Sequence, residues 1–485
     1  MNLDFESIFF DRTVEETLFY SPKIEIKPVH LANGLFRAVC GKFAEARDQH
    51  TAIYPKAYPN SNVNEQIRGV LNSILSADGS LFARAQMSSY TLSHVSHITS
   101  DNHDRRTGEW LSTILTHDSG EGQSLALELL HTLLNQDNRQ RSDEISTLTL
   151  PLTRSNFELK DFKPQMLEQH PSSLRVDETG AFCDPLLYSI RKGFDRIAKQ
   201  DRGKGNFGEK LDTLRRLATW GCFSIYLHLA NSGSLDREKR VPMMLCMVES
   251  PSPTLRQAST QSYQWAGRSI DKFFRAAIRD TLNRIAEEGI YGSWETDADI
   301  RQQIQTMAWK ASSGRMQQAE ARLAKYTPQC LLFYDSYLSD TANQSPRAAF
   351  ANAAADMIDQ IVSSSPTAVA HSLGTRIGLL SPGPYSRKRY TAVPDLLEVL
   401  VRATIPPQEQ WTIDELAHYW ANHYGLLFGA LGDENARLAE WGINAIDGSS
   451  LYDNTDALAT ILELSGYAQR YADGVILVSA RGVDL

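Results

Sequence analysis

A long amphipathic stretch, residues 262–289, most constrains how this 485-residue chain folds. Its sequence is SYQWAGRSIDKFFRAAIRDTLNRIAEEG, and apolar side chains recur in it every three to four residues: Ile270, Phe274, Ile278, Leu282 and Ile285. That spacing places them on one face of an α-helix. Comparable spacing recurs in 107–115, 184–200, 209–233 and 347–364. The sequence therefore predicts a mostly α, multi-domain protein with minor β structure.

Two short segments favour β structure instead. VPMMLCMVES, residues 241–250, is a short continuous apolar run, which is typical of a buried strand. KIEIKPVHL, residues 23–31, alternates apolar and polar side chains, as a half-buried strand does. Both are too short to change the predicted class, so the strands are expected as minor additions to the helices.

The C-terminal part predicts three helices followed by a hairpin. The segments 394–405 and 412–429 have helical spacing, and 454–480 reads as a helix and then a β-hairpin that turns at Ala472-Asp473-Gly474. This order resembles the winged-helix subunits of multi-protein bacterial assemblies that handle or defend DNA. The connection between the second and third helices is longer than the tight turn of a simple helix-turn-helix.

A break rich in Ser, Pro and Gly at 363–390 separates this part from the rest of the chain. We therefore expect four segments. They are a mixed, mainly helical N-terminal domain (1–170), a central helical domain with one buried strand (171–365), a linker (366–390) and a winged-helix-like domain (391–485).

Charge is distributed very unevenly. The net charge is −9, but residues 391–485 hold four arginines, no lysine and fourteen acidic residues, which is a net charge of −10 for this part. The remaining 390 residues hold 45 basic and 44 acidic residues and are close to neutral. The winged-helix-like domain is therefore expected to dock a protein partner, because its field opposes approach to DNA.

Composition bounds the location of the protein. Its five cysteines are scattered without a CxxC pair, which argues against a disulfide framework and a cysteine zinc site. The N-terminal sequence carries acidic residues where a signal peptide has basic ones. No apolar run approaches the roughly 18 residues that span a bilayer. We expect a cytoplasmic protein without membrane contact.

A polar segment, SHVSHITSDNHDRR at 93–106, has the side chains of a metal site. Its candidate ligands, together with a second His-Asp doublet, are His94, His97, Asp101, His103, Asp104, His117 and Asp118. His-Asp doublets resemble the core of the HD phosphohydrolase family, which also needs an upstream histidine and a distant aspartate on helices. Here the upstream histidine is only nine residues away, and the segment is rich in Ser and β-branched residues. We expect a polar surface segment without a metal.

The segment AVAHSLGTRIG, residues 368–378, resembles the nucleophile elbow of α/β-hydrolases, with Ser372 as the nucleophile. Ala370 stands where that motif usually has glycine, and no strong strand precedes it. The sequence favours a short helix here and a serine that is not a nucleophile.

GKGNFG, residues 203–208, matches the letters of a dinucleotide fingerprint. It follows a predicted helix, whereas that fingerprint must follow a strand. We expect a basic loop between helices. The sequence contains no GxxxxGK[ST] phosphate loop, and no cofactor is expected.

Two groups of basic residues are candidates for contact with nucleic acid or another anionic partner. One, the basic stripe, repeats at helical spacing along 262–289 and consists of Arg268, Lys272, Arg275 and Arg279. The other lies in the expected linker and consists of Arg387, Lys388 and Arg389. The alternative for the stripe is a solvated helix face, partly neutralised by Asp271 and Asp280.

No complete set of catalytic residues emerges. The favoured interpretation is a non-enzymatic subunit or adaptor of a larger bacterial assembly, such as a DNA-associated or anti-phage defence complex. One alternative is a hydrolase that uses either the histidine segment with a metal or Ser372. Another is a stand-alone DNA-binding regulator.

Overall fold

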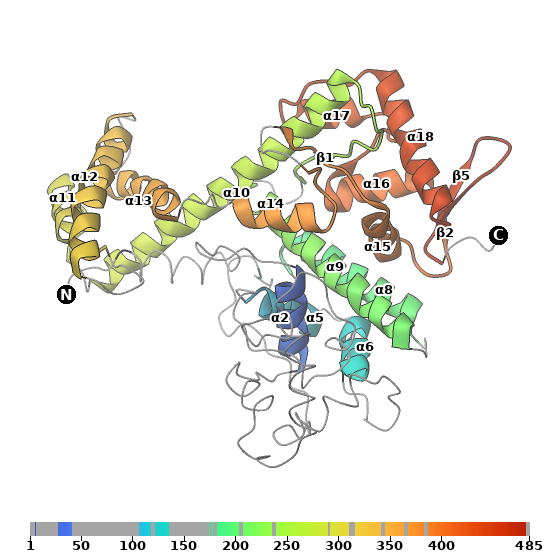
Figure 1. Ribbon diagram of the computed structural model, residues 1–485, viewed down its shortest axis with the longest axis horizontal. Helices are drawn as coiled ribbons and strands as arrows, with labels where there is room; N and C mark the ends of the chain where they lie inside the picture. Colours follow the sequence, from blue (N-terminus) through green and yellow to red (C-terminus); the bar gives the residue numbers. More distant parts are fainter. Residues whose placement is uncertain are drawn as a thin grey trace, which may run out of the picture. The chain divides into compact units, whose positions relative to one another are not determined.

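The computed structural model is mostly helical, as expected, with a few short strands (Figure 1). The residues that it describes are 5, 28–40, 106–117, 122–134, 174, 177, 182–202, 207–234, 239–289, 292–309, 316–340, 345–362, 367–382 and 387–481. None of the described helices is long and apolar enough to cross a membrane.

The chain forms two compact units. The first contains residues Met1–Glu25 and Gly267–Val369, and the second contains Ile26–Ala266 and Ala370–Leu485. Helix α10 (Pro253–Glu288) contributes its first part to the second unit and its remainder to the first. The domain bounds expected from the sequence remain predictions.

The first unit packs the C-terminal part of α10 with α11 (Asp297–Thr306), α12 (Met316–Asp340) and α13 (Pro346–Val362). Helix α11 begins at a capping box, in which Thr296 and Asp299 satisfy each other's backbone N–H groups. The core includes the apolar face predicted for 262–289 from Phe274 onward, together with aromatic side chains such as Trp294 and Phe350. The period of the sequence therefore identified the buried side of this helix correctly.

In the second unit, α2 (Pro28–Cys40) packs against α5 (Thr107–Thr116) and α6 (Leu125–Leu134). The crossing of α2 and α5 is very close, because a Cβ at Gly108 would lie 2.0 Å from the carbonyl carbon of Gly34. The strand expected at 23–31 is wrong for Pro28–Leu31, which form the first turn of α2. A proline is favoured in a first helical turn, where its missing N–H has no intrahelical partner anyway.

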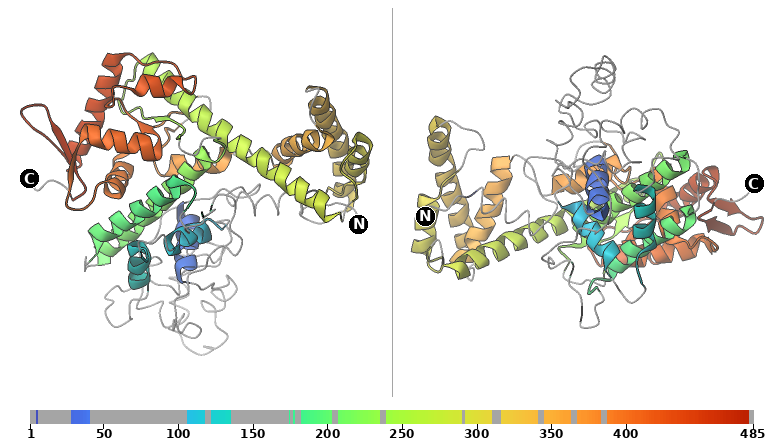
Figure 2. Two further views of the ribbon diagram at one scale, coloured as in Figure 1. Left: turned by 180° about the vertical axis from the view of Figure 1, so that it is seen from behind. Right: turned by 90° about the horizontal axis from the view of Figure 1, so that it is seen from below.

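Helices α8 (Pro185–Asp201) and α9 (Phe207–Asn231) lie side by side in all three views of the ribbon (Figures 1 and 2). Asp184 caps α8 by accepting a hydrogen bond from the Leu186 N–H, and Pro185 follows it, as the sequence predicts. The indole of Trp220 on α9 covers Gly193 on α8 and donates a hydrogen bond of 3.0 Å to the Ile190 carbonyl.

The predicted strand at 241–250 is confirmed in shortened form. Strand β1 (Met243–Met244) is buried and pairs in parallel with β3 (Leu426–Leu427), almost two hundred residues away in sequence. Buried Asn454 lies on α18 (Gly448–Leu464) and joins that helix to the strand pair. Its side-chain amide accepts a hydrogen bond from the Met247 N–H and donates hydrogen bonds to the carbonyls of Leu245 and Phe428.

The C-terminal part contains the three predicted helices and the hairpin in the predicted order, with a further short helix and two short strands between them. After α14 (Thr367–Arg376) come α15 (Pro394–Thr404), β2 (Gln410–Thr412), α16 (Ile413–Tyr424), β3, α17 (Glu434–Ala439) and α18 (Gly448–Leu464). The hairpin β4 (Ala468–Arg470) and β5 (Ile476–Ser479) ends this part, and its turn contains Gly474 with a positive φ of 86°. Strands β2, β5 and β4 form an antiparallel sheet with β5 in the centre.

Candidate functional site

Helix α18 and the hairpin β4–β5 form the candidate site, because they belong to the acidic C-terminal part in which the sequence predicts a docking surface for a protein partner. The helix begins at Asp447, whose carboxylate accepts hydrogen bonds from the hydroxyl groups of Thr254 and Ser450 and from the Ser450 N–H. These hydrogen bonds, that of Thr254 first, hold the pKa of Asp447 well below its ordinary value. The start of the helix is thus fixed by a charged cap.

Carboxylates of α18 neutralise the arginine of the hairpin. The guanidinium of Arg470 on β4 lies 2.7 Å from a carboxylate oxygen of Asp456 and 3.0 Å from one of Glu463. These hydrogen bonds, that of Asp456 first, raise the pKa of Arg470. Both carboxylates belong to α18. Arg470, the one Lys or Arg of this helix and hairpin, is therefore held in ion pairs along the surface and is not directed outward.

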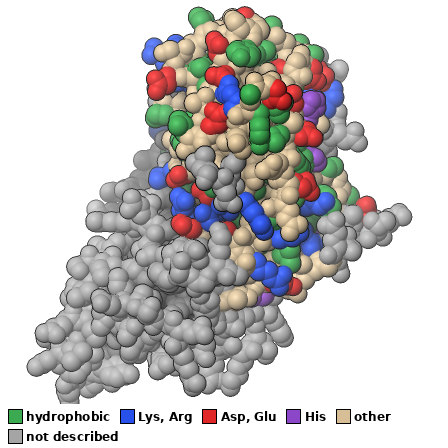
Figure 3. All heavy atoms as spheres, turned by 90° about the vertical axis from the view of Figure 1, so that its right-hand side faces the viewer, with side chains coloured by type: hydrophobic (Ala, Val, Ile, Leu, Met, Phe, Trp, Pro, Cys, Tyr) green, Lys and Arg blue, Asp and Glu red, His purple; other side chains and the backbone are tan. Residues whose placement is uncertain are grey.

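Large apolar side chains are exposed on the same two elements. Tyr452 and Leu464 on α18 are 70% and 84% exposed, and the hairpin turn adds Tyr471 and Val475 at 43% and 40%. Figure 3 looks onto the side of the second unit where the hairpin lies, and hydrophobic side chains lie there among Asp and Glu in the upper part of the face. Aromatic side chains such as those of Tyr452 and Tyr471 are enriched at protein interfaces.

Two further arginines of the C-terminal part are also bound internally. Arg437 on α17 lies 3.0 Å from a carboxylate oxygen of Asp433, and Arg402 on α15 lies 3.2 Å from one of Glu398. Only Arg481 among the four arginines after residue 390 has no ion pair with the described residues. The exposed charge of this part is therefore predominantly negative.

A buried ionic network fixes α15 to α8 and α9. The side chain of Asp201 at the end of α8 is completely buried, and its carboxylate lies 3.0 Å from a nitrogen of Arg216 and 3.4 Å from one of Arg402. Glu398 lies 2.6 Å from the same Arg216. Burial raises the pKa of Glu398, but the guanidinium groups of Arg216 and Arg402 outweigh that effect and lower it.

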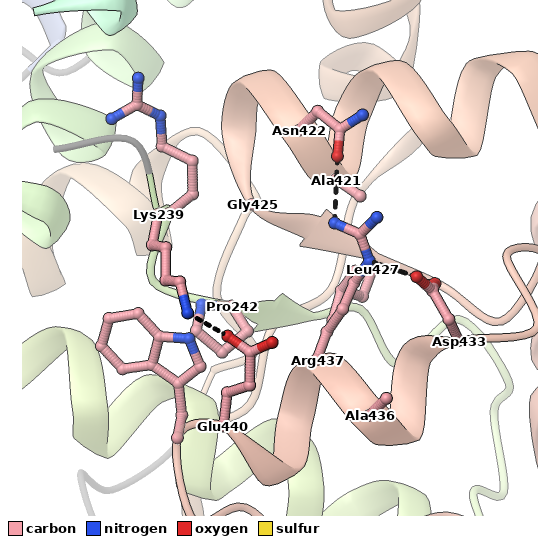
Figure 4. A pocket seen from close by; sticks show the side chains of 12 residues that line it. Lys239, Pro242, Ala421, Asn422, Gly425, Leu427, Asp433, Ala436, Arg437 and Glu440 are labelled. Atoms are coloured by element: carbon pink, nitrogen blue, oxygen red, sulfur yellow. Dashed lines mark hydrogen bonds and ion pairs between the residues drawn. The ribbon is translucent and has the colours of Figure 1, made fainter. Parts of the chain in front are cut away.

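A cavity of about 500 Å³ opens beside α16 and α17 in the second unit. Its rim carries two sets of paired charges: Lys239 with Glu440 at 2.8 Å, and Arg437 with Asp433 at 3.0 Å (Figure 4). Arg437 also donates to the side-chain oxygen of Asn422 at 3.0 Å. Lys239 and Arg437 on this rim are therefore each paired with a carboxylate.

The basic stripe lies on α10 in the first unit, and its members differ in environment. Arg268, Lys272 and Arg279 are exposed. Arg275 is partly buried, and its guanidinium lies 2.9 Å from Asp271 and 2.6 Å from Asp356 on α13. Arg275 thus joins α10 to α13. Contact of the basic stripe with an anionic partner remains a prediction, and it concerns chiefly the exposed members of the stripe.

The second basic group also divides. Arg387 is exposed and Arg389 is partly buried, whereas Lys388 is only 1% exposed. The Lys388 ammonium donates to the Thr375 hydroxyl at 2.9 Å and to the Ser381 carbonyl at 3.0 Å, and burial lowers its pKa. Lys388 thus contributes to the interior, and only its neighbours present charge toward solvent.

The expectation for Ser372 is confirmed in its structural part. The residue lies within helix α14 and not at a turn between a strand and a helix, and its hydroxyl accepts a hydrogen bond from Arg376 at 3.2 Å. The neighbouring His371 pairs with the Tyr263 hydroxyl at 2.8 Å. That Ser372 is not a nucleophile stays a prediction, which labelling with a fluorophosphonate probe tests.

Residues 93–105 of the histidine segment and the GKGN sequence of 203–206 lie outside the described residues. Of the candidate metal ligands, only His117 is described; it follows α5, and its ring packs 4.2 Å from that of Phe182. Among the described residues, no group of three or more His, Cys, Asp or Glu side chains is arranged to hold a metal ion.

No protein-family model matches this sequence, and no curated protein is significantly similar to it.

Sequence reasoning missed the ionic network around Asp201 and the amide of Asn454. Each has a partner about two hundred residues away, Arg402 for Asp201 and the Leu245 carbonyl for Asn454, which no local pattern indicates. One signal was present: charged or amide side chains such as Arg402 stand within otherwise apolar helical stretches. The missing information was which distant partner satisfies each one.

Proposed function

We propose that this chain is a non-enzymatic adaptor, and that its C-terminal elements form a winged-helix-like module that docks a protein partner. The three main helices α15, α16 and α18, followed by the hairpin and a sheet of order β2-β5-β4, are the elements that a winged helix requires. Helix α17 accounts for the long connection between the second and third helices.

One observation carries the proposal: the surface that would meet DNA in a DNA-reading winged helix is acidic and apolar. Such a module presents Lys and Arg from its third helix and wing, because phosphate contacts need cations or well-aimed donors. Here Arg470 is bound by Asp456 and Glu463, beside exposed Leu464 and Tyr471. The matching partner carries Lys and Arg around an apolar patch, which suits a subunit of a larger assembly.

We further propose a cytoplasmic location, from the scattered cysteines. A DNA-associated or anti-phage complex is the setting we favour for the adaptor. The support is the predicted order of helices and hairpin and the exposed cations of the basic stripe.

Co-purification of the full chain from its native cells tests the docking surface. The variant Leu464→Ser with Tyr471→Ser should lose the partner that the native chain retains, or bind it at least about 10-fold more weakly once purified, because buried aromatic anchors dominate interfaces. Leu332→Ser, which changes a 63% exposed leucine of the first unit, is the matched control and should retain the partner.

The competing function is DNA reading by α18. Sequence-specific binding of duplex DNA by the full chain, abolished by Arg470→Gln, would overturn the proposal. So would equal loss of the partner in the Leu332→Ser control, because it would show that the effect of the double variant is not specific to the hairpin surface.

A further inference from the structure

Strand β4 of the hairpin is an edge strand of the three-stranded sheet in the second unit. The order β2-β5-β4 places β5 in the centre, with β2 and β4 on the outside. The hairpin extends beyond the neighbouring helix α18 in Figures 1 and 2. An edge strand has outward backbone N–H and C=O groups to which a strand of another chain can bond.

The register of the hairpin shows which backbone groups of β4 face outward. The Ser479 N–H donates a hydrogen bond of 2.9 Å to the Tyr467 carbonyl, so Tyr467 bonds toward β5. Bonding toward the partner strand alternates along an antiparallel ladder, and the outward residues are therefore Ala468, Arg470 and, at the turn, Ala472. No described residue is hydrogen-bonded to the backbone groups of these three. Ala468 is only 6% exposed, so the open part of the edge is 470–472.

The other edge of the sheet is used by the chain itself. Strand β2 leads directly into α16, and Thr412 is both its last residue and the N-cap of that helix. The Thr412 N–H donates a hydrogen bond of 2.7 Å to the Glu415 carboxylate as part of the capping box. Segment 470–472 of β4 is therefore the better site for a further strand.

The surface around this open edge is acidic. Asp447, α18 and the hairpin together hold five carboxylates and one arginine, which is a net charge of −4. Asp453 on α18 and Asp473 in the hairpin turn are exposed, and neither has an ion pair with the described residues. Arg481 follows β5 at the end of the hairpin that lies away from the turn. A segment with electrostatic complementarity to this edge carries Lys or Arg.

The two faces of the sheet at this edge differ in chemistry. Side chains alternate along a strand, so Gln469 and Tyr471 share one face, on which Tyr471 is 43% exposed. Arg470 lies on the other face, where it binds Asp456 and Glu463 of α18. The side chains of an added strand alternate in the same way. Apolar side chains suit the face of Tyr471, and Lys or Arg suit the face of the carboxylates.

We propose that segment 470–472 binds an extended segment of the protein partner, which adds a fourth strand to the sheet and alternates apolar residues with Lys or Arg. This mode of binding rests on the proposed function, since it describes how the docking surface holds its partner. In strand addition, backbone hydrogen bonds supply affinity and alternate side chains supply specificity. A second copy of this chain does not fit, because pairing β4 with β4 brings together two surfaces of net charge −4.

Fluorescence anisotropy of the full chain with the labelled peptide Lys-Val-Lys-Val-Lys-Val-Lys tests the proposal. Arg470→Pro removes the outward N–H and should bind the peptide roughly 10-fold more weakly than Arg470→Gln, because one backbone hydrogen bond is lost and its carbonyl partner stays unsatisfied. Both variants lose the ion pairs with Asp456 and Glu463, so the comparison isolates the backbone group. The peptide Glu-Val-Glu-Val-Glu-Val-Glu should not bind, since its charges repel the surface.

Hydrogen exchange of the native chain does not depend on how the variants fold. Measured residue by residue, the Lys-Val peptide should slow exchange of the Arg470 and Ala472 N–H groups and leave that of Gln469, which bonds toward β5, as before. Unchanged exchange at Arg470 and Ala472 overturns the proposal. Equal affinity of Arg470→Pro and Arg470→Gln, or no binding at millimolar peptide, does the same.

Co-purification separates the failure of strand addition from the failure of the proposed function. If the double variant Leu464→Ser with Tyr471→Ser loses the partner and Arg470→Pro retains it, the docking surface stands and strand addition is overturned. If both variants retain the partner, the docking surface and strand addition are both overturned. A dimer of the native chain in sedimentation velocity, dissociated by Arg470→Pro, would overturn the proposal in favour of a second copy.

Discussion

Asp359 on α13 has a carboxyl group whose pKa is raised well above its ordinary value in the folded first unit. Burial, and then the nearby charge of Asp271, raise its pKa from the ordinary 3.8 to about 7, although Arg275 acts in the opposite direction. Two other carboxylates, Asp271 and Asp356, already share the guanidinium of Arg275. A third negative charge beside them is unfavourable, so the folded unit prefers neutral Asp359.

The first prediction is that Asp359→Asn stabilises the chain at high pH. A folded-state pKa above the unfolded one contributes stability that is complete below about pH 4 and is lost as pH rises through about 7. The amide cannot ionise, so the melting temperature of the variant should exceed that of the native chain at pH 8 by more than it does at pH 5.

Asp356→Asn serves as the control at the same helix. Its carboxylate binds Arg275 at 2.6 Å and accepts a hydrogen bond from the Tyr337 hydroxyl at 2.7 Å, so its replacement should lower the melting temperature at both pH values. An Asp359→Asn chain that gains no more at pH 8 than at pH 5 would contradict the role given to Asp359.

Packing between elements depends on glycine at the contact of α8 and α9. A Cβ built on Gly193 would lie 2.2 Å from the Trp220 ring, which is fully buried and bonded to the Ile190 carbonyl. The Trp220 ring has no room to move away from such a Cβ, since it also packs edge-on against Tyr424 at 5.5 Å. Gly193 therefore determines how closely the two helices approach.

The second prediction is that Gly193→Ala lowers the free energy of unfolding by about 2 kcal/mol, because overpacking a buried contact outweighs the better helix propensity of alanine. Chemical denaturation followed by tryptophan fluorescence measures it. Gly448→Ala, at an α18 position where a Cβ meets nothing within 4 Å, is the matched control and should change stability little. Equal stability of the Gly193→Ala chain would show that the helices separate without penalty.

Local signals in the sequence predicted much of the element structure. The Asp184-Pro185 start of α8, the apolar face of α10 and the glycine turn of the hairpin each depend on neighbouring residues only, and the structure confirms them. The parallel pairing of β1 with β3 depends on partners far apart in sequence and was not predicted. Lys388 was expected to be a surface cation. Its burial was not predicted, because it depends on contacts with Thr375 and Ser381 that form only in the folded chain.

The same limit applies to the candidate surfaces. The acidic character of the C-terminal part follows from composition, but the binding of Arg470 by Asp456 and Glu463 follows from the pairing of β4 with β5 beside α18.

Across the second unit, the network around Asp201 makes distant parts of the chain interdependent. Asp201 and Thr213 come from α8 and α9, whereas Glu398 and Arg402 come from α15. Arg402 also donates a hydrogen bond of 3.3 Å to the hydroxyl of Tyr467 at the start of the hairpin. Buried ion pairs of this kind tolerate the loss of one partner poorly, because the remaining charges stay buried without compensation.

The last prediction is that Asp201→Asn destabilises the helices α8 and α9 and the C-terminal elements together. The variant leaves Arg216 and Arg402 with Glu398 as their remaining carboxylate in the network, so the free energy of unfolding should fall by about 3 kcal/mol. Asp395→Asn, which removes a 76% exposed partner of Arg215, should change it by less than about 0.5 kcal/mol. Hydrogen exchange measured by mass spectrometry locates the effect. Faster exchange in both α9 and α18 is expected, since the network joins them in one cooperative body. Faster exchange in α8 and α9 alone, with α15 to α18 as protected as before, would mean that the C-terminal elements fold independently of the helices they pack against.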